Sequence, residues 1–304
     1  MPTEPNAESP PVCDYEGSDY QQRFWEEGGR EYEDQVEAIA IRRLLPKAGK
    51  RLLELGAGAG RNTPRYKDFE QIVLLDYSKT QLQQAQKSLG SSEKYIYVAA
   101  DAYRLPFVDG LFDGATMIRT LHHMADAPKA LAQVEATLAP KGFFLLEFAN
   151  KLNLKAILRY LLRSQEWSPF TLEPVEFMEL NFDFHPRAIR RWLGELGFAL
   201  KRTLTVSHFR IGWLKRNVPT RLLVWLDSLI QYTGALWQLT PSVFMAARAR
   251  ADKKVASANS FFKCPECGAG LPLKKAGQID CPECGLAWGI EKGIYNFKTP
   301  LKAS

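Results

Sequence analysis

Long apolar runs are missing from this sequence, and its first residues lead us to expect no signal peptide. No stretch approaches the ~18 apolar residues that a helix needs to span a bilayer, which excludes a helical integral membrane protein. The first residues, MPTEPNAESPPV, have neither the basic start nor the apolar core of a signal peptide. With 46% hydrophobic and 24% charged residues, the composition is that of an ordinary globular protein. We therefore expect a cytoplasmic protein.

Cysteine is scarce, and four of the five cysteines are concentrated in two CPEC units. Cys264 and Cys267 form the first unit, Cys281 and Cys284 the second, and thirteen residues separate them. Two CxxC units at this interval are typical of a structural Zn²⁺ site with four thiolate ligands. Because the protein supplies all four ligands, no open metal position for hydrolytic chemistry is expected. Cys13 stands alone, so no disulfide framework is indicated.

Charge is unevenly distributed along the chain, whose net charge is +6. Residues 1–40 carry eleven Asp and Glu against two Lys and Arg. Residues 201–250 carry eight Lys and Arg against one Asp. The basic segment indicates either contact with an anionic surface or ligand, or simply a solvated helix face.

Short apolar runs alternate with helical patterns over the first half of the chain. Strands are expected at 51–55, 72–76, 95–99, 113–118 and 142–149, and helices at 31–45, 60–69, 78–89 and 127–139. Residues 198–207 and 242–248 are expected to add an antiparallel pair, with helical patterns at 186–196 and 211–239 around them. This alternation predicts an α/β, Rossmann-like fold: a seven-stranded, mainly parallel sheet with helices on both faces.

A glycine-rich loop follows the first strand. Gly56, Gly58 and Gly60 let the backbone turn tightly and let a ligand approach it closely. The spacing is G-x-G-x-G, whereas dinucleotide enzymes use G-x-G-x-x-G. Glu54, just before the loop, would repel a pyrophosphate but favours a cationic sulfonium ligand with an α-amino group. Asp76 ends the next strand, where one carboxylate can accept both hydroxyls of a ribose.

A third strand ends in Asp101 and Ala102, which suits recognition of an adenine amino group. The motifs LLELGAGAG, VLLDYS, AADAYRLPF, FDGATMIRTLHHM and ALAQVEATLAPKGFFLLEF follow in order. With them, residues 30–150 resemble class I S-adenosylmethionine-dependent methyltransferases, in the branch of the ubiquinone/menaquinone C-methyltransferases. The resemblance implies a cofactor pocket lined by Glu54, Gly56, Gly58, Asp76, Tyr77, Asp101, Ala102 and Arg119.

The acceptor site is less clearly marked in the sequence. His122 and His123 follow the fourth strand, at the sheet edge where ligands bind, and either is a candidate general base. Packing or hydrogen bonding within the loop is the alternative role, and His185 is a weaker candidate base. Candidates for lining the pocket, or for packing a lid, are Tyr20, Trp25, Tyr32 and Tyr103.

Two sequence features that are absent after the fourth strand narrow the range of methylation reactions. No Asn-Pro-Pro-Tyr follows the fourth strand, which disfavours methylation of an amide or of adenine N6. No cysteine lies there either, so the covalent route to pyrimidine C5 lacks a nucleophile. The apolar helical stretch around residues 222–230 caps a hydrophobic substrate, rests on a membrane surface, or packs as an ordinary helix.

The C-terminal GLAWGIEKGIYNF resembles small zinc-ribbon proteins that activate tRNA, rRNA and protein methyltransferases. That resemblance makes RNA an alternative substrate, which the zinc ribbon would bind. Charge disfavours it, because residues 261–304 carry six Lys against four Asp and Glu, and a zinc with four thiolates cancels the excess. The ribbon would then stabilise the domain or mediate self-association.

These observations predict four segments. They are a disordered tail (1–18), a methyltransferase domain (19–249) whose acceptor-binding region is 151–241, a linker (250–260) and a zinc ribbon (261–304). The expected function is methyl transfer from S-adenosylmethionine to a small, apolar, quinone- or lipid-like acceptor. The alternatives are an RNA methyltransferase and a non-catalytic, cofactor-binding partner subunit.

Overall fold

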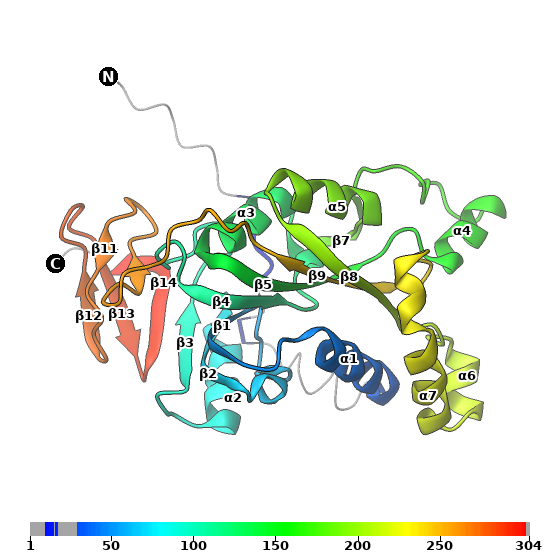
Figure 1. The fold of residues 1–304 in the computed structure, drawn as a ribbon, viewed down its shortest axis with the longest axis horizontal. Helices are drawn as coiled ribbons and strands as arrows, with labels where there is room; N and C mark the ends of the chain where they lie inside the picture. Colours follow the sequence, from blue (N-terminus) through cyan, green and yellow to red (C-terminus); the bar gives the residue numbers. More distant parts are fainter. Residues whose placement is uncertain (1–9, 15, 18–28, 302–304) are drawn as a thin grey trace, which may run out of the picture.

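The computed structural model (Figure 1) describes residues 10–14, 16–17 and 29–301. Its centre is a ten-stranded mixed sheet with the order β12-β13-β14-β3-β2-β1-β4-β5-β9-β8. The strands are β1 (Gly49–Leu55), β2 (Phe69–Asp76), β3 (Tyr95–Ala99), β4 (Phe112–Met117), β5 (Leu138–Ala149), β8 (Ala199–Val206), β9 (Ser242–Arg248), β12 (Gly277–Asp280), β13 (Ala287–Glu291) and β14 (Ile294–Leu301). Strands β1 to β5 pair in parallel, and β9 pairs antiparallel with both β5 and β8. The Rossmann-like α/β arrangement expected from the sequence is therefore present.

Helices cover both faces of the sheet (Figure 1). They are α1 (Glu31–Leu44), α2 (Lys79–Leu89), α3 (Ala127–Thr137), α4 (Leu154–Leu161), α5 (Pro186–Glu195), α6 (Gly212–Asn217) and α7 (Thr220–Ile230), with the 3-10 helices η2 (Thr63–Tyr66), η3 (Leu121–His123) and η4 (Gln231–Ala235). Buried apolar side chains of α3 and α5 pack on one face, and those of α1, α2 and α7 pack on the other. Among the described residues, no helix is long and apolar enough to cross a bilayer.

The sheet has ten strands where the sequence predicted seven, because the C-terminal strands join it. Strand β14 pairs in parallel with β3, with Ile294 opposite Tyr97 and Tyr295 opposite Val98. Trp288 and Phe297 are buried in the same apolar core as the central strands. Pairing with β14 gives the edge of β3 hydrogen-bond partners that it would otherwise lack. The domain boundaries around residues 250–260 remain a prediction.

Two further segments differ from the sequence expectation. The helix expected at 60–69 is only the short η2, because a helix begun at residue 60 would place Pro64 in its interior, and because β2 already begins at Phe69. Of the tail predicted at 1–18, residues 10–14 and 16–17 are described, and among them Val12 forms a β-bridge with Met124. Two small antiparallel pairs complete the fold: β6 (Val175–Met178) with β7 (Asn181–Asp183), and β10 (Phe262–Lys263) with β11 (Gly270–Leu271).

The strand order indicates where a ligand-binding crevice lies. Strand β1 lies between β2 and β4, so the chain reverses its direction of travel across the sheet at β1. In open α/β sheets, ligands bind beyond the carboxyl ends of the strands at such a switch point. The loops after β1, β2, β3 and β4 are therefore the ones that build the site.

Candidate functional site

The loop after β1 is shaped by its glycines. The amides of Gly56 and Ala57 both donate to the carbonyl of Leu75, at 2.8 and 3.0 Å, which folds the loop back over β2. Gly56 has a φ of +72°, and a Cβ added there would lie 2.1 Å from Oγ1 of Thr120. Only glycine therefore fits this turn.

Asp76, at the end of β2, holds this loop. Its Oδ2 accepts a hydrogen bond from the amide of Gly58 at 2.8 Å, and its Oδ1 accepts one from the amide of Ser78 at 2.9 Å. Burial raises the pKa of this carboxyl. Since each carboxylate oxygen has two acceptor sites, Asp76 retains the capacity to accept two hydroxyl groups of a ligand.

The loops enclose a cavity of about 930 Å³, a volume that includes solvent at its mouth. Of the residues that the sequence singled out, the following line it: Gly56, Gly58, Asp76, Tyr77, Ala102, Arg119 and His123. Glu54, Gly60, Asp101 and His122 are not among its lining residues.

Glu54 lies behind the glycine loop and is 4% exposed. Its Oε2 accepts a hydrogen bond from the hydroxyl of Thr63 at 2.6 Å. Burial raises the pKa of this carboxyl to about 8, so it is mostly protonated at neutral pH in the ligand-free protein. Because the pKa of Glu54 is higher in the folded than in the unfolded protein, folding favours the protonated carboxyl. Its contribution to the free energy of unfolding is fully present below the unfolded-state pKa and is lost as the pH rises through about 8.

A cationic ligand in the cavity is expected to ionise Glu54. Binding of S-adenosylmethionine at pH 7 should then release a proton from this carboxyl. Calorimetric titrations in two buffers of different ionisation enthalpy measure that release. The Glu54→Gln variant keeps an oxygen that accepts the hydrogen bond of Thr63, and its binding should release no proton at this position. The variant thus distinguishes protons released by Glu54 from protons released by Asp76. Equal binding enthalpies in both buffers would contradict the expectation.

Asp101 organises the turn after β3. Its Oδ1 accepts a hydrogen bond from the amide of Tyr103 at 2.8 Å, and its Oδ2 lies 3.5 Å from Nε of Arg104. Only its neighbour Ala102 reaches the cavity wall. The contact of Asp101 with an adenine group remains a prediction.

Arg119 has a strained backbone next to the cavity, with a φ of +55°. Its amide donates to Oε2 of Glu147 at 2.8 Å, and its Nε donates to Oε1 of Glu37 at 2.8 Å. Burial alone would raise the pKa of Glu37, but Arg119 and Arg61 hold it below its usual range. The sequence analysis missed Glu37 and Glu147, although each is a carboxylate within an apolar stretch, which is the available signal.

His123 is the candidate base that lines the cavity. Its Nδ1 lies 3.1 Å from the carbonyl oxygen of Leu180. A carbonyl only accepts, so Nδ1 carries the proton and Nε2 is the basic nitrogen. Burial lowers the pKa of His123, and burial together with His123 lowers that of His122, whose ring centre lies 4.0 Å away.

The other aromatic and histidine candidates have structural contacts. His185 caps the N-terminus of α5, where its Nδ1 accepts a hydrogen bond from the amide of Arg187. The hydroxyl of Tyr32 donates to Asp227 at 2.6 Å, and that of Tyr103 accepts from the amide of Asp126 at 3.2 Å. Tyr20 and Trp25 lie outside the described residues.

The N-terminal segment contributes to the site, which the sequence analysis did not anticipate. Val12 and Cys13 line the cavity. Glu16 accepts hydrogen bonds from the amides of Lys79 and Thr80, at 2.9 and 3.0 Å, at the start of α2. The bridge between Val12 and Met124 therefore places this segment along one wall of the cavity.

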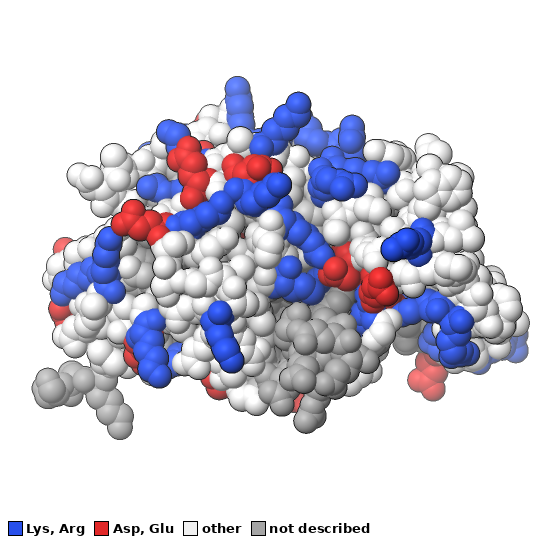
Figure 2. Space-filling model, turned by 90° about the horizontal axis from the view of Figure 1, so that it is seen from below, with Lys and Arg blue, Asp and Glu red and all other residues white. Residues whose placement is uncertain are grey.

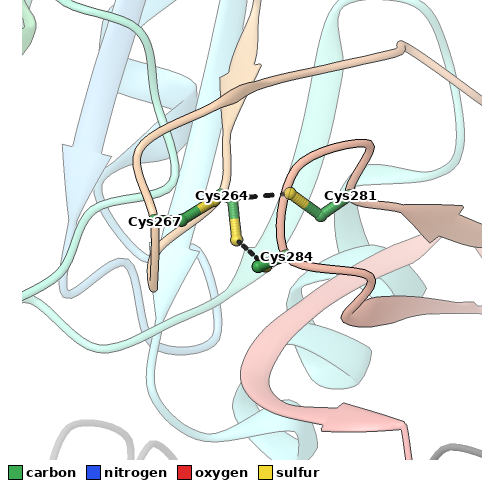
Figure 3. Close-up of side chains that lie close together, drawn as sticks. All are labelled: Cys264, Cys267, Cys281 and Cys284. Carbon is green, nitrogen blue, oxygen red and sulfur yellow. Dashed lines mark hydrogen bonds between the residues drawn. The ribbon is translucent and has the colours of Figure 1, made fainter.

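The four cysteines of the CPEC units converge (Figure 3). The sulfur atoms of Cys264, Cys267, Cys281 and Cys284 all lie within 4.8 Å of one another. Sγ of Cys264 is 3.8 Å from that of Cys284, and Sγ of Cys267 is 3.4 Å from that of Cys281. A tetrahedron with zinc–sulfur bonds of ~2.3 Å requires sulfur–sulfur distances of ~3.8 Å, so the cluster is compatible with zinc.

Residues 53–146 match the family model of the methyltransferase domain. The chain contains a methyltransferase domain. An O-methyltransferase of Penicillium expansum, cnsE, is 32% identical over 129 residues, which are 38% of this chain and 46% of that protein. The demethylmenaquinone methyltransferase of Clavibacter sepedonicus is 32% identical over 120 residues, 38% of this chain and 49% of that protein. The chain thus spans about half the length of these relatives.

The methyltransferase domain also has structural neighbours. A chain of the complex between the Haloferax volcanii Trm112 methyltransferase activator and a methyltransferase is 14% identical, with a TM-score of 0.54. The match covers 76% of this chain and 96% of that chain. At this identity the similarity shows the fold alone, which is a Rossmann-like α/β methyltransferase fold with a large mixed sheet.

Proposed function

We propose that this protein transfers the methyl group of S-adenosylmethionine to a small, apolar, quinone- or lipid-like acceptor. The observation that carries the proposal is the cavity at the switch point, where the glycine loop, Asp76, Tyr77 and Arg119 meet. S-adenosylmethionine would supply an activated methyl group, so the protein needs only to bind, orient and, where required, deprotonate. The names of the similar O- and quinone methyltransferases support an acceptor of this class.

In this proposal the chain positions the cofactor from three sides. Asp76 accepts the ribose hydroxyls while keeping its hold on Gly58. Ionised Glu54 stabilises the cationic end from behind the loop. Ala102 and the neighbouring strand ends contact the adenine, and Ile118 and Met124 supply apolar wall for ligand contact.

His123 is proposed as the base that removes a proton from the acceptor. Its lowered pKa keeps it unprotonated at neutral pH, and the Leu180 carbonyl orients Nε2 as the basic nitrogen. His123→Gln is expected to lower the turnover rate by roughly 10²–10⁴-fold and to leave affinity for S-adenosylmethionine nearly unchanged. In the wild type, the acid limb of the pH–rate profile should lie below the ordinary histidine pKa of 6.5.

His122→Gln is the matched control, because His122 is the sequence neighbour that does not line the cavity. Steady-state rates with a responsive acceptor, measured across pH, separate the two positions. An unchanged rate in His123→Gln would remove the base role from this residue.

RNA is a poorer candidate substrate. Lys263, Lys274, Lys275 and Lys298 of the C-terminal region all form ion pairs with carboxylates. On the face seen in Figure 2, Lys and Arg clearly outnumber Asp and Glu, but they are spread over the face and do not gather in one patch. Nucleic-acid binding normally uses a concentrated basic surface, so these features favour the small acceptor.

We also propose that the cysteine cluster holds one structural zinc. The donor set of four thiolates and the sulfur–sulfur distances fit a closed tetrahedral site. Because β14 continues the sheet from β3, the zinc-bound segment would stabilise the methyltransferase domain from within the same chain.

Transfer of label from tritiated S-adenosylmethionine to fractionated lysate tests the proposed function. Counts are expected in the lipid-soluble fraction, and they should disappear with Asp76→Ala. Counts in RNA would support the alternative substrate. Cofactor binding with no labelled product in any fraction would support the non-catalytic partner subunit.

A further inference from the structure

One end of the molecule is unusually apolar. It comprises α4, α6, α7 and residues 232–239, and it lies opposite the C-terminal strands (Figure 1). We call it the apolar end. Large side chains there are more than half exposed, among them Leu161, Trp213, Trp225, Leu236 and Trp237. Exposed apolar side chains gathered at one end of a protein indicate an interaction site.

Helix α7 is apolar on both sides. Its inner face buries Leu223 and Val224 against the body of the protein. Its outer face carries Leu222, Trp225 and Leu229, which are 46, 57 and 56% exposed and lie at i, i+3 and i+7. A surface helix normally presents polar residues on that side. The outer face of α7 therefore exposes an apolar stripe to solvent.

Helix α4 has the same character. Ala156 is its one buried residue, while Leu154, Leu158 and Leu161 are 53, 49 and 66% exposed. The amide of Leu154 donates to the carbonyl of Leu239 at 2.8 Å, which ties the start of α4 to the segment that follows α7. The exposed apolar residues of the two regions are thus part of one end of the protein.

The exposed charges of the apolar end have a single sign. Lys155, Arg159, Arg216 and Arg221 are exposed and form no ion pair with any carboxylate of the described residues. Lys215 is different, because its Nζ is 2.8 Å from Oε1 of Glu33.

The acid among these three helices faces inward. Asp227 has no exposed surface and accepts hydrogen bonds from the hydroxyl of Tyr32 and the amide of His208. The outward charges of α4, α6 and α7 are therefore cationic.

We propose that the apolar end lies on the surface of an anionic lipid bilayer. Leucine and tryptophan on one side, with lysine and arginine beside them, are the composition of helices that lie in the membrane interface. Cations near a bilayer gain from its negative surface potential. A second copy meeting this end symmetrically would place the unpaired cations of both copies together, which is unfavourable. The inference does not depend on the proposed reaction.

Flotation of the full-length protein with vesicles tests the proposal. We expect binding at least about tenfold tighter to vesicles containing about one third phosphatidylglycerol than to pure phosphatidylcholine, because several unpaired cations contribute. Bound protein should show a blue-shifted tryptophan emission, and high salt should reduce the preference for anionic lipid. Equal binding to both vesicles, or binding to neither, would overturn the proposal.

Paired variants locate the contact. Leu161→Ser with Trp225→Ser should reduce vesicle binding by at least about tenfold through the loss of apolar contact. Val255→Ser with Leu273→Ser is the matched control, since these residues are 70 and 55% exposed outside the apolar end. Thermal unfolding verifies that both variants are folded. An equal loss in the control, or a dimer that the first variant abolishes, would show that the bilayer is not the occupant.

Discussion

Gly56→Ala is expected to weaken the binding of S-adenosylmethionine by roughly 100-fold. Left-handed backbone strain and overpacking together cost about 3 kcal/mol. The new Cβ would lie 2.1 Å from Oγ1 of Thr120, whose hydroxyl donates to the carbonyl of Leu55. The variant loop therefore relaxes to another turn, and the ligand must restore the original one. Calorimetric titration of purified protein measures the loss.

Gly90→Ala is the control for backbone strain. Gly90 also has a positive φ, +82°, but no heavy atom lies within 4 Å of an added Cβ. It ends α2, outside the cavity lining. This variant should lose about 1–3 kcal/mol of stability, because its ψ of −180° places Gly90 in a region that is essentially restricted to glycine, and it should bind the cofactor as the wild type does. Wild-type affinity in Gly56→Ala would refute the assigned role of the loop.

Loss of the zinc site is expected to destabilise the whole protein. Structural zinc contributes about 10–16 kcal/mol in small zinc modules, which is comparable with the stability of a domain. Cys264 and Cys281 are buried in the same apolar core as the central strands. We expect one zinc per chain in the wild type, its loss in Cys264→Ser, and a melting temperature lower by more than about 10 °C.

Elemental analysis and calorimetry measure these effects. Cys13→Ser is the matched control, because Cys13 is the cysteine outside the cluster, and its zinc content should be unchanged. The pairing of β14 with β3 predicts that the wild type unfolds in a single transition. A native protein without metal would refute the zinc site, and two separate transitions would show that the ribbon unfolds as an independent domain.

Much of the cofactor site could be predicted from the sequence because its determinants are local. Positive φ at Gly56 and Gly58 and the position of Asp76 at a strand end follow from short-range patterns. The carboxylates that surround Arg119 could not be found in the same way. Glu37 comes from α1 and Glu147 from β5, and their approach to one guanidinium and one amide depends on how distant elements pack.

For His122 and His123 as well, the sequence predicted part of the answer and the tertiary structure decided the rest. Their place after β4 identified both as candidates, but local sequence treats adjacent residues alike. The structure separates them, because the carbonyl of Leu180 meets His123 and only His123 reaches the cavity. The direction of a side chain in a loop is decided by its tertiary neighbours.

The sequence by itself determined the Rossmann-like alternation, the glycine loop and the two cysteine pairs, since each depends on spacing along the chain. Only the tertiary structure decided that β14 extends the sheet at β3, that residues 12–13 line the cavity, and that the outer face of α7 remains exposed. Strand pairing joins segments nearly 200 residues apart, and no local pattern encodes the partner. A helix that is apolar on both sides likewise does not reveal which side the protein will cover.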